Sequence, residues 1–120
     1  MSIFQLSDLL YLQGKAGKPY LEFLCSQSLS VGVYVLPVGA VDHQSAHGED
    51  EVYYVARGRG MLYLDDKEGG HDQRVEPGSV IFVGAGVEHR FHDISEDLVL
   101  VVFFAPPEGS RAKEKVRPAG

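Results

Sequence analysis

The feature that most constrains the fold of this chain is one apolar run, "LVLVVFFA", at residues 98–105. The run is far shorter than the ~20 residues that a membrane-spanning helix needs. Its valines and phenylalanines favour strands, and it lacks the polar alternation of a half-exposed strand. The sequence therefore predicts a strand buried on both faces near the end of the chain, and no membrane span.

Shorter segments of the same character precede this run and are separated by turns that contain glycine or proline. Two adjacent glycines in "KEGG" (67–70) supply the positive φ angles of a hairpin, and Gly58 and Gly60 are expected to reverse the chain tightly. About eight strands at spacings of roughly 8–12 residues are typical of an all-β sandwich or barrel. The expected strands are 20–25, 30–37, 51–57, 61–66, 73–78, 79–84, 88–94 and 97–105.

The two ends of the chain differ from this pattern. We expect residues 1–19 to form an N-terminal arm or short helix that begins near Ser7 or Asp8, both good N-cap residues. Residues 107–120 show no apolar periodicity and are expected to form a mobile C-terminal tail. The predicted barrel therefore occupies residues 20–106.

The composition of the chain bears on its possible binding partners and on the cellular compartment in which we expect it. Hydrophobic residues make up 44% of the 120 residues and charged residues 23%, as in globular proteins. The formal net charge of -6 argues against a nucleic-acid partner, because phosphate binding needs a basic face. Cys25 is the only cysteine, so no internal disulfide can form, and a reducing compartment, the cytoplasm, is the expected location.

Three residues at the starts of predicted strands could bind a metal ion. His47 precedes Glu51 by four residues, so both point to one face where the backbone is extended, and His89 follows a glycine-rich turn. Two imidazoles and one carboxylate suit a first-row divalent cation with open positions. The alternative that the spacing leaves open is a solvated acidic loop beside a histidine that caps a turn.

Two blocks of the sequence resemble the motifs of the cupin superfamily. The first block keeps the spacing G-x5-H-x-H-x3-E-x6-G, with serine in place of the first histidine, and the second keeps G-x5-P-x-G-x2-H-x3-N, with glycine for proline and aspartate for asparagine. The matching positions are Gly39, Ser45, His47, Glu51 and Gly58, then Gly78, Gly84, Gly86, His89 and Asp93. The resemblance implies a small single-domain protein, an antiparallel jelly-roll barrel, with His47, Glu51 and His89 as metal ligands.

Ser45 is the most informative departure from the cupin pattern. A neutral hydroxyl is a weak ligand for a first-row dication, so we expect that Ser45 lines the pocket without coordinating the metal. Water, the carbonyl oxygen of Gln44 or the imidazole of His43 could take the vacant position. A surface loop is the competing interpretation of His43.

The alternation of side chains along a strand also predicts which aromatic residues face inward. Tyr53 shares the parity of Glu51 and Phe91 that of His89, so both are expected inside the barrel, while Tyr54 faces the other way. Core packing is the simplest role for Tyr53 and Phe91. Both are also candidates to line the pocket.

The function that this reasoning favours is a metalloenzyme of the dioxygenase or oxidoreductase type that acts on a small molecule. Fe(II) is slightly favoured over Zn, Mn or Ni, because two histidines and one carboxylate leave positions for dioxygen and substrate. A metal-dependent isomerase or lyase, and a non-catalytic module that binds a small ligand, are the alternatives. The resemblance also implies a homodimer.

Overall fold

The apolar run at residues 98–105 lies in the centre of the sheet. The structure is a computed structural model that describes residues 2–110. Strand β6 (Glu88–Ala105), which contains the run, lies between β2 (Ser30–Leu36) and β3 (Asp50–Asp66). On one face Leu100 and Val102 are 0% and 1% exposed, whereas Phe103 on the other face is 40% exposed. The prediction that this strand is buried on both faces is therefore wrong, because only the inner face of the sheet packs on the core.

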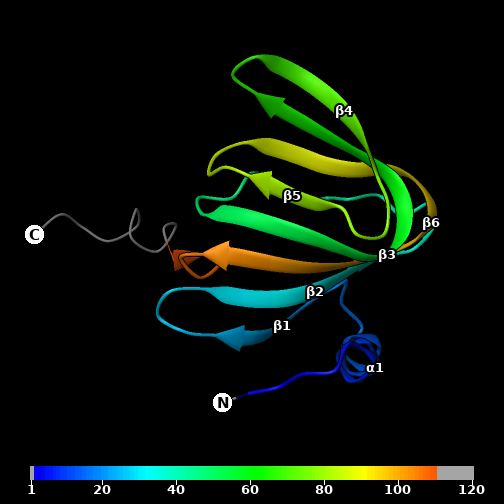
Figure 1. Ribbon diagram of the computed structural model, residues 1–120, viewed down its shortest axis with the longest axis vertical. Helices are drawn as coiled ribbons and strands as arrows, with labels where there is room; N and C mark the ends of the chain where they lie inside the picture. The colour runs from blue at the N-terminus through cyan, green and yellow to red at the C-terminus, as the bar shows by residue number, and fades with distance from the viewer. Residues whose placement is uncertain (1, 111–120) are drawn as a thin grey trace, which may run out of the picture.

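The described residues form one antiparallel sheet that curls into a barrel (Figure 1). The strand order is β1-β2-β6-β3-β4, and β5 pairs with β3 off this path. The remaining strands are β1 (Tyr20–Cys25), β4 (Gly69–Val75) and β5 (Val80–Val83). The sheet has six strands within residues 2–110, fewer than the sequence pattern suggests, because two expected pairs of strands are each one long strand. The all-β class and the antiparallel barrel are confirmed.

The long strands β3 and β6 bend together, and this bend gives the sheet two facing layers. The register of the β3–β6 pair shifts repeatedly between Val55 and Met61. At the bend Gly58 has a φ of 93°, and a Cβ atom there would collide with the carbonyl oxygen of Asp97. The expectation that Gly58 and Gly60 reverse the chain is therefore wrong. Gly58 instead lets β3 bend while it stays paired with β6.

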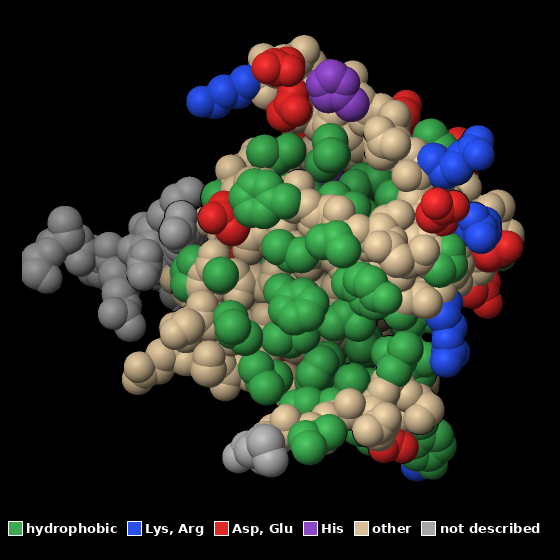
Figure 2. Space-filling view, viewed as in Figure 1, with side chains coloured by type: hydrophobic (Ala, Val, Ile, Leu, Met, Phe, Trp, Pro, Cys, Tyr) green, Lys and Arg blue, Asp and Glu red, His purple; other side chains and the backbone are tan. Residues whose placement is uncertain are grey.

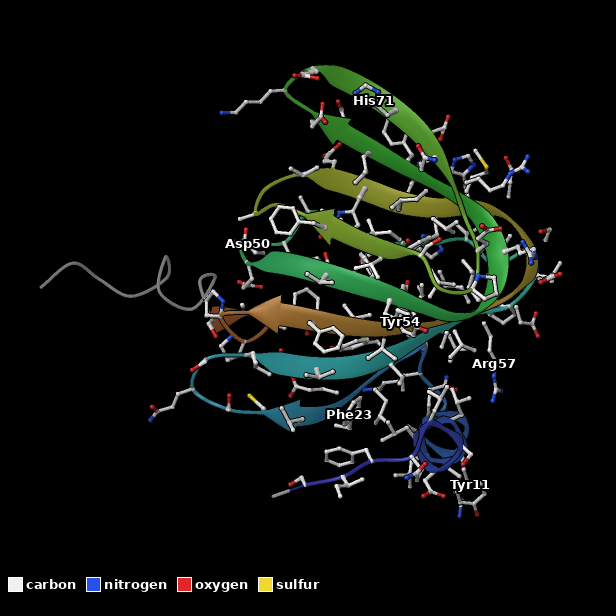
Figure 3. The ribbon with its side chains drawn as sticks, in the orientation of Figure 1. Tyr11, Phe23, Asp50, Tyr54, Arg57 and His71 are labelled. Atoms are coloured by element: carbon white, nitrogen blue, oxygen red, sulfur yellow. The ribbon has the colours of Figure 1, made fainter. Side chains whose placement is uncertain are left out.

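The core fills the space between the two layers. Tyr53 is 0% and Phe91 is 1% exposed, and their rings pack edge to face with centroids 5.1 Å apart. Tyr54, the neighbour of Tyr53, is 43% exposed on the outside of the sheet (Figure 3). The alternation predicted from the sequence therefore holds on β3 and on β6.

The N-terminal helix α1 (Leu6–Ala16) packs against β1 and β2. It starts earlier than expected, because Gln5 is the N-cap residue, in extended conformation and without a side-chain capping bond, and not Ser7 or Asp8. Within residues 2–110, no helix is long and apolar enough to span a membrane. Residues 107–110 lie against the barrel, and the rest of the expected tail, residues 111–120, lies outside the described residues.

Replacement of Gly58 by alanine tests the role of the bend. The added methyl group would meet the Asp97 carbonyl and force a left-handed φ on a residue with a Cβ, so we expect a loss of about 3 kcal/mol in the free energy of unfolding. Gly84→Ala is the matched control, because a Cβ there meets only side chains at 3.8 Å and should change stability by less than about 1 kcal/mol. Urea denaturation of both variants measures the difference, and equal losses would contradict the bend's importance.

Candidate metal centre

Three side chains that are distant in the sequence meet inside the barrel. One ligand atom from each of His47, Glu51 and His89 lies within 4.8 Å of the other two. The His89 Nε2 and Glu51 Oε1 atoms are 3.1 Å apart, and both side chains are almost fully buried. His47 is partly buried, and its ring stacks edge to face on Phe104 with centroids 4.9 Å apart. A single cation placed among these atoms could contact all three.

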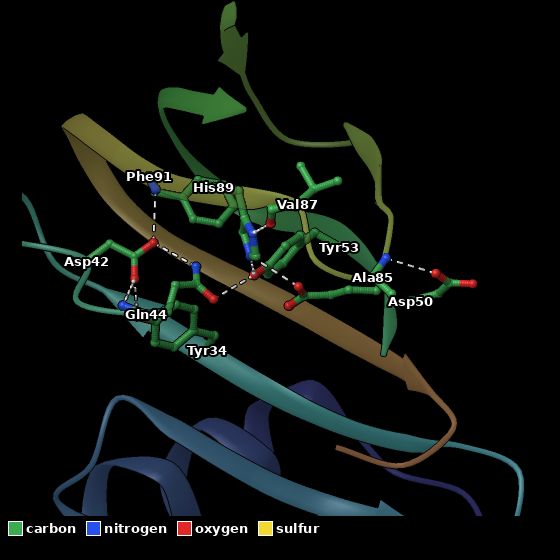
Figure 4. A network of polar contacts seen from close by, with 10 residues as sticks. Tyr34, Asp42, Gln44, Asp50, Tyr53, Ala85, Val87, His89 and Phe91 are labelled. Carbon is green, nitrogen blue, oxygen red and sulfur yellow. Dashed lines mark hydrogen bonds and ion pairs between the residues drawn. The ribbon is translucent and has the colours of Figure 1, made fainter. Parts of the chain in front are cut away.

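Backbone hydrogen bonds hold the loop that carries His47 against the turn that precedes β6. The Gly86 N–H donates to the His47 carbonyl oxygen at 2.7 Å. Close by, the Ala85 N–H donates to Asp50 Oδ1 at 3.0 Å (Figure 4). The glycine turn is thus joined to the loop through His47 and to the first residue of β3 through Asp50. These two contacts hold the start of β6, which carries His89, near His47.

The hydrogen bonds of His89 determine which of its ring nitrogens is free. Nδ1 lies 2.9 Å from the Val87 carbonyl oxygen, which can only accept, so Nδ1 carries a proton and Nε2 faces inward. Nε2 lies 3.0 Å from the hydroxyl oxygen of Tyr53 as well as 3.1 Å from Glu51. Burial lowers the pKa of His89, but the nearby Glu51 carboxylate and the hydrogen bond to the Val87 carbonyl outweigh this effect, so the pKa is raised. Nε2 therefore favours a positive partner, either a proton or a cation.

The Glu51 carboxylate fits a metal ligand. The residue is 2% exposed, and among residues 2–110 neither carboxylate oxygen accepts a hydrogen bond. A buried carboxylate without hydrogen bonds costs several kcal/mol or more unless a cation compensates it. Its neighbours are two imidazoles, which are common ligands of divalent first-row metals. The donor set is therefore consistent with a bound dication.

A second layer of buried polar groups supports this cluster (Figure 4). Asp42, 7% exposed, accepts hydrogen bonds from the Tyr34 hydroxyl at 2.7 Å, the Gln44 side-chain amide at 2.7 Å and the Phe91 backbone N–H at 2.9 Å. Gln44 Oε1 in turn accepts the proton of the Tyr53 hydroxyl at 2.9 Å. Burial, and then the charge of Glu51, raise the pKa of Tyr53, so its hydroxyl remains a donor.

Sequence reasoning missed Asp42 and Tyr34. Asp42 occupies a position at which the first motif specifies no residue. Its partners Tyr34 and Phe91 are 8 and 49 positions away in the chain. No local spacing could therefore mark the aspartate. The sequence offers one weak signal: apart from His43, Asp42 is the only ionisable residue in the stretch 37–46.

The candidates for the vacant position of the motif lie in different places. The side chain of Gln44 lines a cavity beside the metal centre, but both ends of its amide are already hydrogen-bonded. His43 is exposed and lines the same cavity without joining the cluster of three. Ser45 is exposed and lines a separate hollow on the other side of His89.

The cavity beside the cluster has a volume of about 230 Å³. His47, Glu51 and Tyr53 line it, whereas Phe91 is not part of its wall and packs behind Tyr53 in the core. Most of the remaining wall is aliphatic or aromatic. A cavity of this kind beside a possible metal site could hold a small molecule.

Comparison with known proteins identifies the family. The sequence matches the cupin domain over residues 32–104. The chain belongs to the cupin family. A protein of Streptomyces coelicolor described as uncharacterized is 43% identical to this cupin over 108 residues, which cover 90% of this chain and 99% of that protein.

Solved structures share the fold of this cupin at low sequence identity. The protein BH2720 from Bacillus halodurans matches with a TM-score of 0.71 and 20% identity, over 88% of this chain and 81% of that one. A variant of Bacillus subtilis oxalate decarboxylase matches with a TM-score of 0.62 and 22% identity, over 67% of this chain and 22% of the decarboxylase. Fe(II)-HppE with an alternative substrate matches with a TM-score of 0.60 and 22% identity, over 71% of this chain and 48% of HppE.

Removal of one hydroxyl tests whether the buried network stabilises this cupin. Tyr53→Phe leaves Gln44 Oε1 without its donor, so we expect metal-free protein to lose about 1–3 kcal/mol of its free energy of unfolding. Tyr54→Phe is the matched control on the outer face and should change it by less than about 0.5 kcal/mol. Chemical denaturation compares the two variants, and equal stabilities would contradict a stabilising role for the network.

Proposed function

We propose that this cupin binds one divalent metal ion through His47, Glu51 and His89 and acts on a small molecule in the adjoining cavity. The observation that carries the proposal is the Glu51 carboxylate, buried without a hydrogen bond among the described residues and placed beside two imidazoles. The cation would compensate this charge. The proposal predicts metal bound in a one-to-one ratio to the chain.

Within this proposal, an Fe(II)-dependent oxidoreductase is the best-supported activity. Two histidines and one carboxylate with open positions are the donor set of many non-heme Fe(II) oxygenases. The similarity to HppE supports this choice, because that protein with the same fold was solved with Fe(II) and a substrate. Bound Fe(II) would supply one-electron and dioxygen chemistry at the cavity.

The protein's own side chains would position the reactants. The hydrogen bond from His89 Nδ1 to the Val87 carbonyl fixes the ring so that Nε2 faces the metal position. Tyr53, held by Gln44, keeps its proton beside the same position. The mostly apolar wall limits the water around a bound small molecule, which strengthens electrostatic interactions at the centre.

Substitution of Glu51 by glutamine tests the metal site and its chemistry together. Glu51→Gln should reduce bound metal to background while metal-free protein keeps its stability, because the substitution removes a buried charge that accepts no hydrogen bond among the described residues. Elemental analysis of protein purified without chelator measures the metal. Wild-type protein loaded with Fe(II) should also bind nitric oxide, a dioxygen mimic, and give a paramagnetic signal that the variant lacks.

His43→Ala is the control for the metal measurement, because His43 lines the same cavity outside the cluster. It should retain full metal content. Full metal content in Glu51→Gln, or loss of metal in His43→Ala, would overturn the three-residue site. Turnover that needs metal but no dioxygen would favour the isomerase or lyase alternative, to which the similarity with oxalate decarboxylase lends support.

We also propose that the protein forms a homodimer through the outer face of the sheet. Figure 2 shows hydrophobic side chains gathered over this face, with charged residues mostly at its rim. Val80 and Phe82 of β5 are 71% and 64% exposed, and Tyr54 and Phe103 are 43% and 40% exposed. The register places Tyr54 opposite Val80, and Val52 opposite both Phe82 and Phe103, so the patch is continuous. An uncharged patch on a single sheet face fits the same patch of a second copy.

A charge placed in this patch should separate the two copies. Phe82→Glu is expected to shift the sedimentation coefficient to that of a monomer without loss of the barrel, because Phe82 is exposed in one copy. Leu12→Glu, which charges an exposed apolar residue of α1 outside the patch, should leave the dimer intact. A wild-type protein that sediments as a monomer at micromolar concentration would contradict the proposal.

A further inference from the structure

The cavity beside the metal centre is lined by two unlike kinds of side chain. His47 and Glu51 supply donor groups, and aliphatic and aromatic side chains form most of the remaining wall. This wall consists mainly of Tyr20, Tyr34, Leu36, Val102 and Phe104. The volume is about 230 Å³, whereas an apolar cavity of about 150 Å³ is enough to hold benzene. The space beside the metal position is thus large enough for a ring.

The wall is tightly packed around Tyr20. The ring of Tyr20 lies against Gly32, where the Cβ atom of any other residue would collide with it. It packs edge to face on Tyr34 and Phe104, with centroids 6.2 and 6.3 Å apart. Burial, and then the charge of Glu108, raise the pKa of Tyr20, so its hydroxyl stays neutral. The wall therefore favours an uncharged, largely apolar group, beside which the Tyr20 hydroxyl is a donor without a partner among the described residues.

The charges around the cavity are negative. Among residues 2–110 no lysine or arginine lines it, whereas Glu51 and Glu108 do. Burial raises the pKa of Glu108 despite the opposing effect of His47, and the charge of Glu22 raises it further. A second negative group on a ligand in this cavity would therefore find no lysine or arginine among the described residues to pair with, and it would lie near the Glu108 carboxylate.

Hydrogen bonds fix the segment that carries Glu108 at the cavity. The Glu108 backbone N–H donates to the hydroxyl of Ser30 at 2.9 Å, and Ser30 is 0% exposed. The following Gly109 N–H donates to Glu49 Oε1 at 3.1 Å. The backbone of Glu108 is therefore held in place, and the residue is an exposed part of the cavity lining.

We propose that the cavity selects a small molecule with one oxygen-donor head, a ring-sized apolar body and no second negative charge, and that Glu108 sets the charge selectivity. The head would bind the metal ion and the body would pack on the wall around Tyr20. This inference rests on the proposed metal site. It excludes small dianions as preferred ligands.

Three hydroxamates that share one metal-binding head test the inference on Co(II)-loaded protein. Acetohydroxamate carries only the head, benzohydroxamate adds a phenyl ring, and 4-carboxybenzohydroxamate adds a second negative charge to that ring. The visible absorption of Co(II) reports binding of the head, and calorimetry gives each dissociation constant. Elemental analysis before each titration confirms the metal content.

We expect benzohydroxamate to bind the wild-type protein at least about tenfold more tightly than acetohydroxamate, because burial of a ring adds apolar contact. The carboxylated ring should bind at least about tenfold more weakly than the plain ring, because Glu108 repels it and no lysine or arginine among the described residues lines the cavity to pair with it. Similar affinities for the first pair, or tighter binding of the carboxylated probe, would overturn the inference.

The variant Glu108→Gln separates charge selectivity from general weakening of the site. It should improve binding of the carboxylated probe by about threefold to tenfold and leave benzohydroxamate unchanged. Glu68→Gln, in the exposed turn between β3 and β4, is the matched control and should change neither constant. If Glu108→Gln changes both probes equally or neither, Glu108 does not set the selectivity.

The same experiment distinguishes failure of this inference from failure of the proposed function. Protein that takes up no Co(II), or whose Co(II) spectrum does not respond to acetohydroxamate, would refute the metal site and this inference with it. Protein that binds Co(II) and the head but does not discriminate between the three probes would refute only the selectivity.

Discussion

The candidate metal centre depends on the bend that β3 and β6 share near Gly58. In the antiparallel register Glu51 pairs with Phe104, which lies at the opposite end of β6 from His89. A straight strand of that length would separate them by about 50 Å, yet Glu51 Oε1 and His89 Nε2 are 3.1 Å apart. Only the bend, which folds the paired strands back over their own inner face, brings these atoms together. The close approach of Gly58 to Asp97 is thus a condition for the site as well as for the fold.

The bend buries the Glu51 carboxylate beside the His89 imidazole and the Tyr53 phenol. Burial of a charged group away from solvent costs free energy unless other groups compensate it. Asp42 shows how the fold satisfies one buried carboxylate, with donors from Tyr34, Gln44 and Phe91. Glu51 has no such donors among the described residues. The two acids therefore differ in kind: Asp42 organises the surrounding side chains, whereas Glu51 is available to a cation.

Much of this architecture could be predicted from the sequence, and the parts that could not are those set by distant contacts. Alternation along the strands predicted that Tyr53 faces inward and Tyr54 outward, because side-chain direction is a local property. Gly58 indicated that the chain changes direction there, but a positive φ at glycine fits both a hairpin turn and a bend within a paired strand. The choice between them depends on pairing with β6. The role of Asp42 was invisible for the same reason, since its partner Phe91 is 49 positions away.

Ser45 replaces the first histidine of the cupin motif, and the neighbouring Gln44 has a different role at the site. Ser45 lies outside the cavity, and the next residue towards the N-terminus, Gln44, points inward. Its amide is held by Asp42 on one side and Tyr53 on the other, so it positions Tyr53 beside His89. A site with three protein donors leaves more of the cation's coordination sphere to a ligand than a site with four. Because most of the adjoining wall is apolar and Glu108 is acidic, the open positions on the cation would be the strongest attraction for an oxygen donor in the cavity.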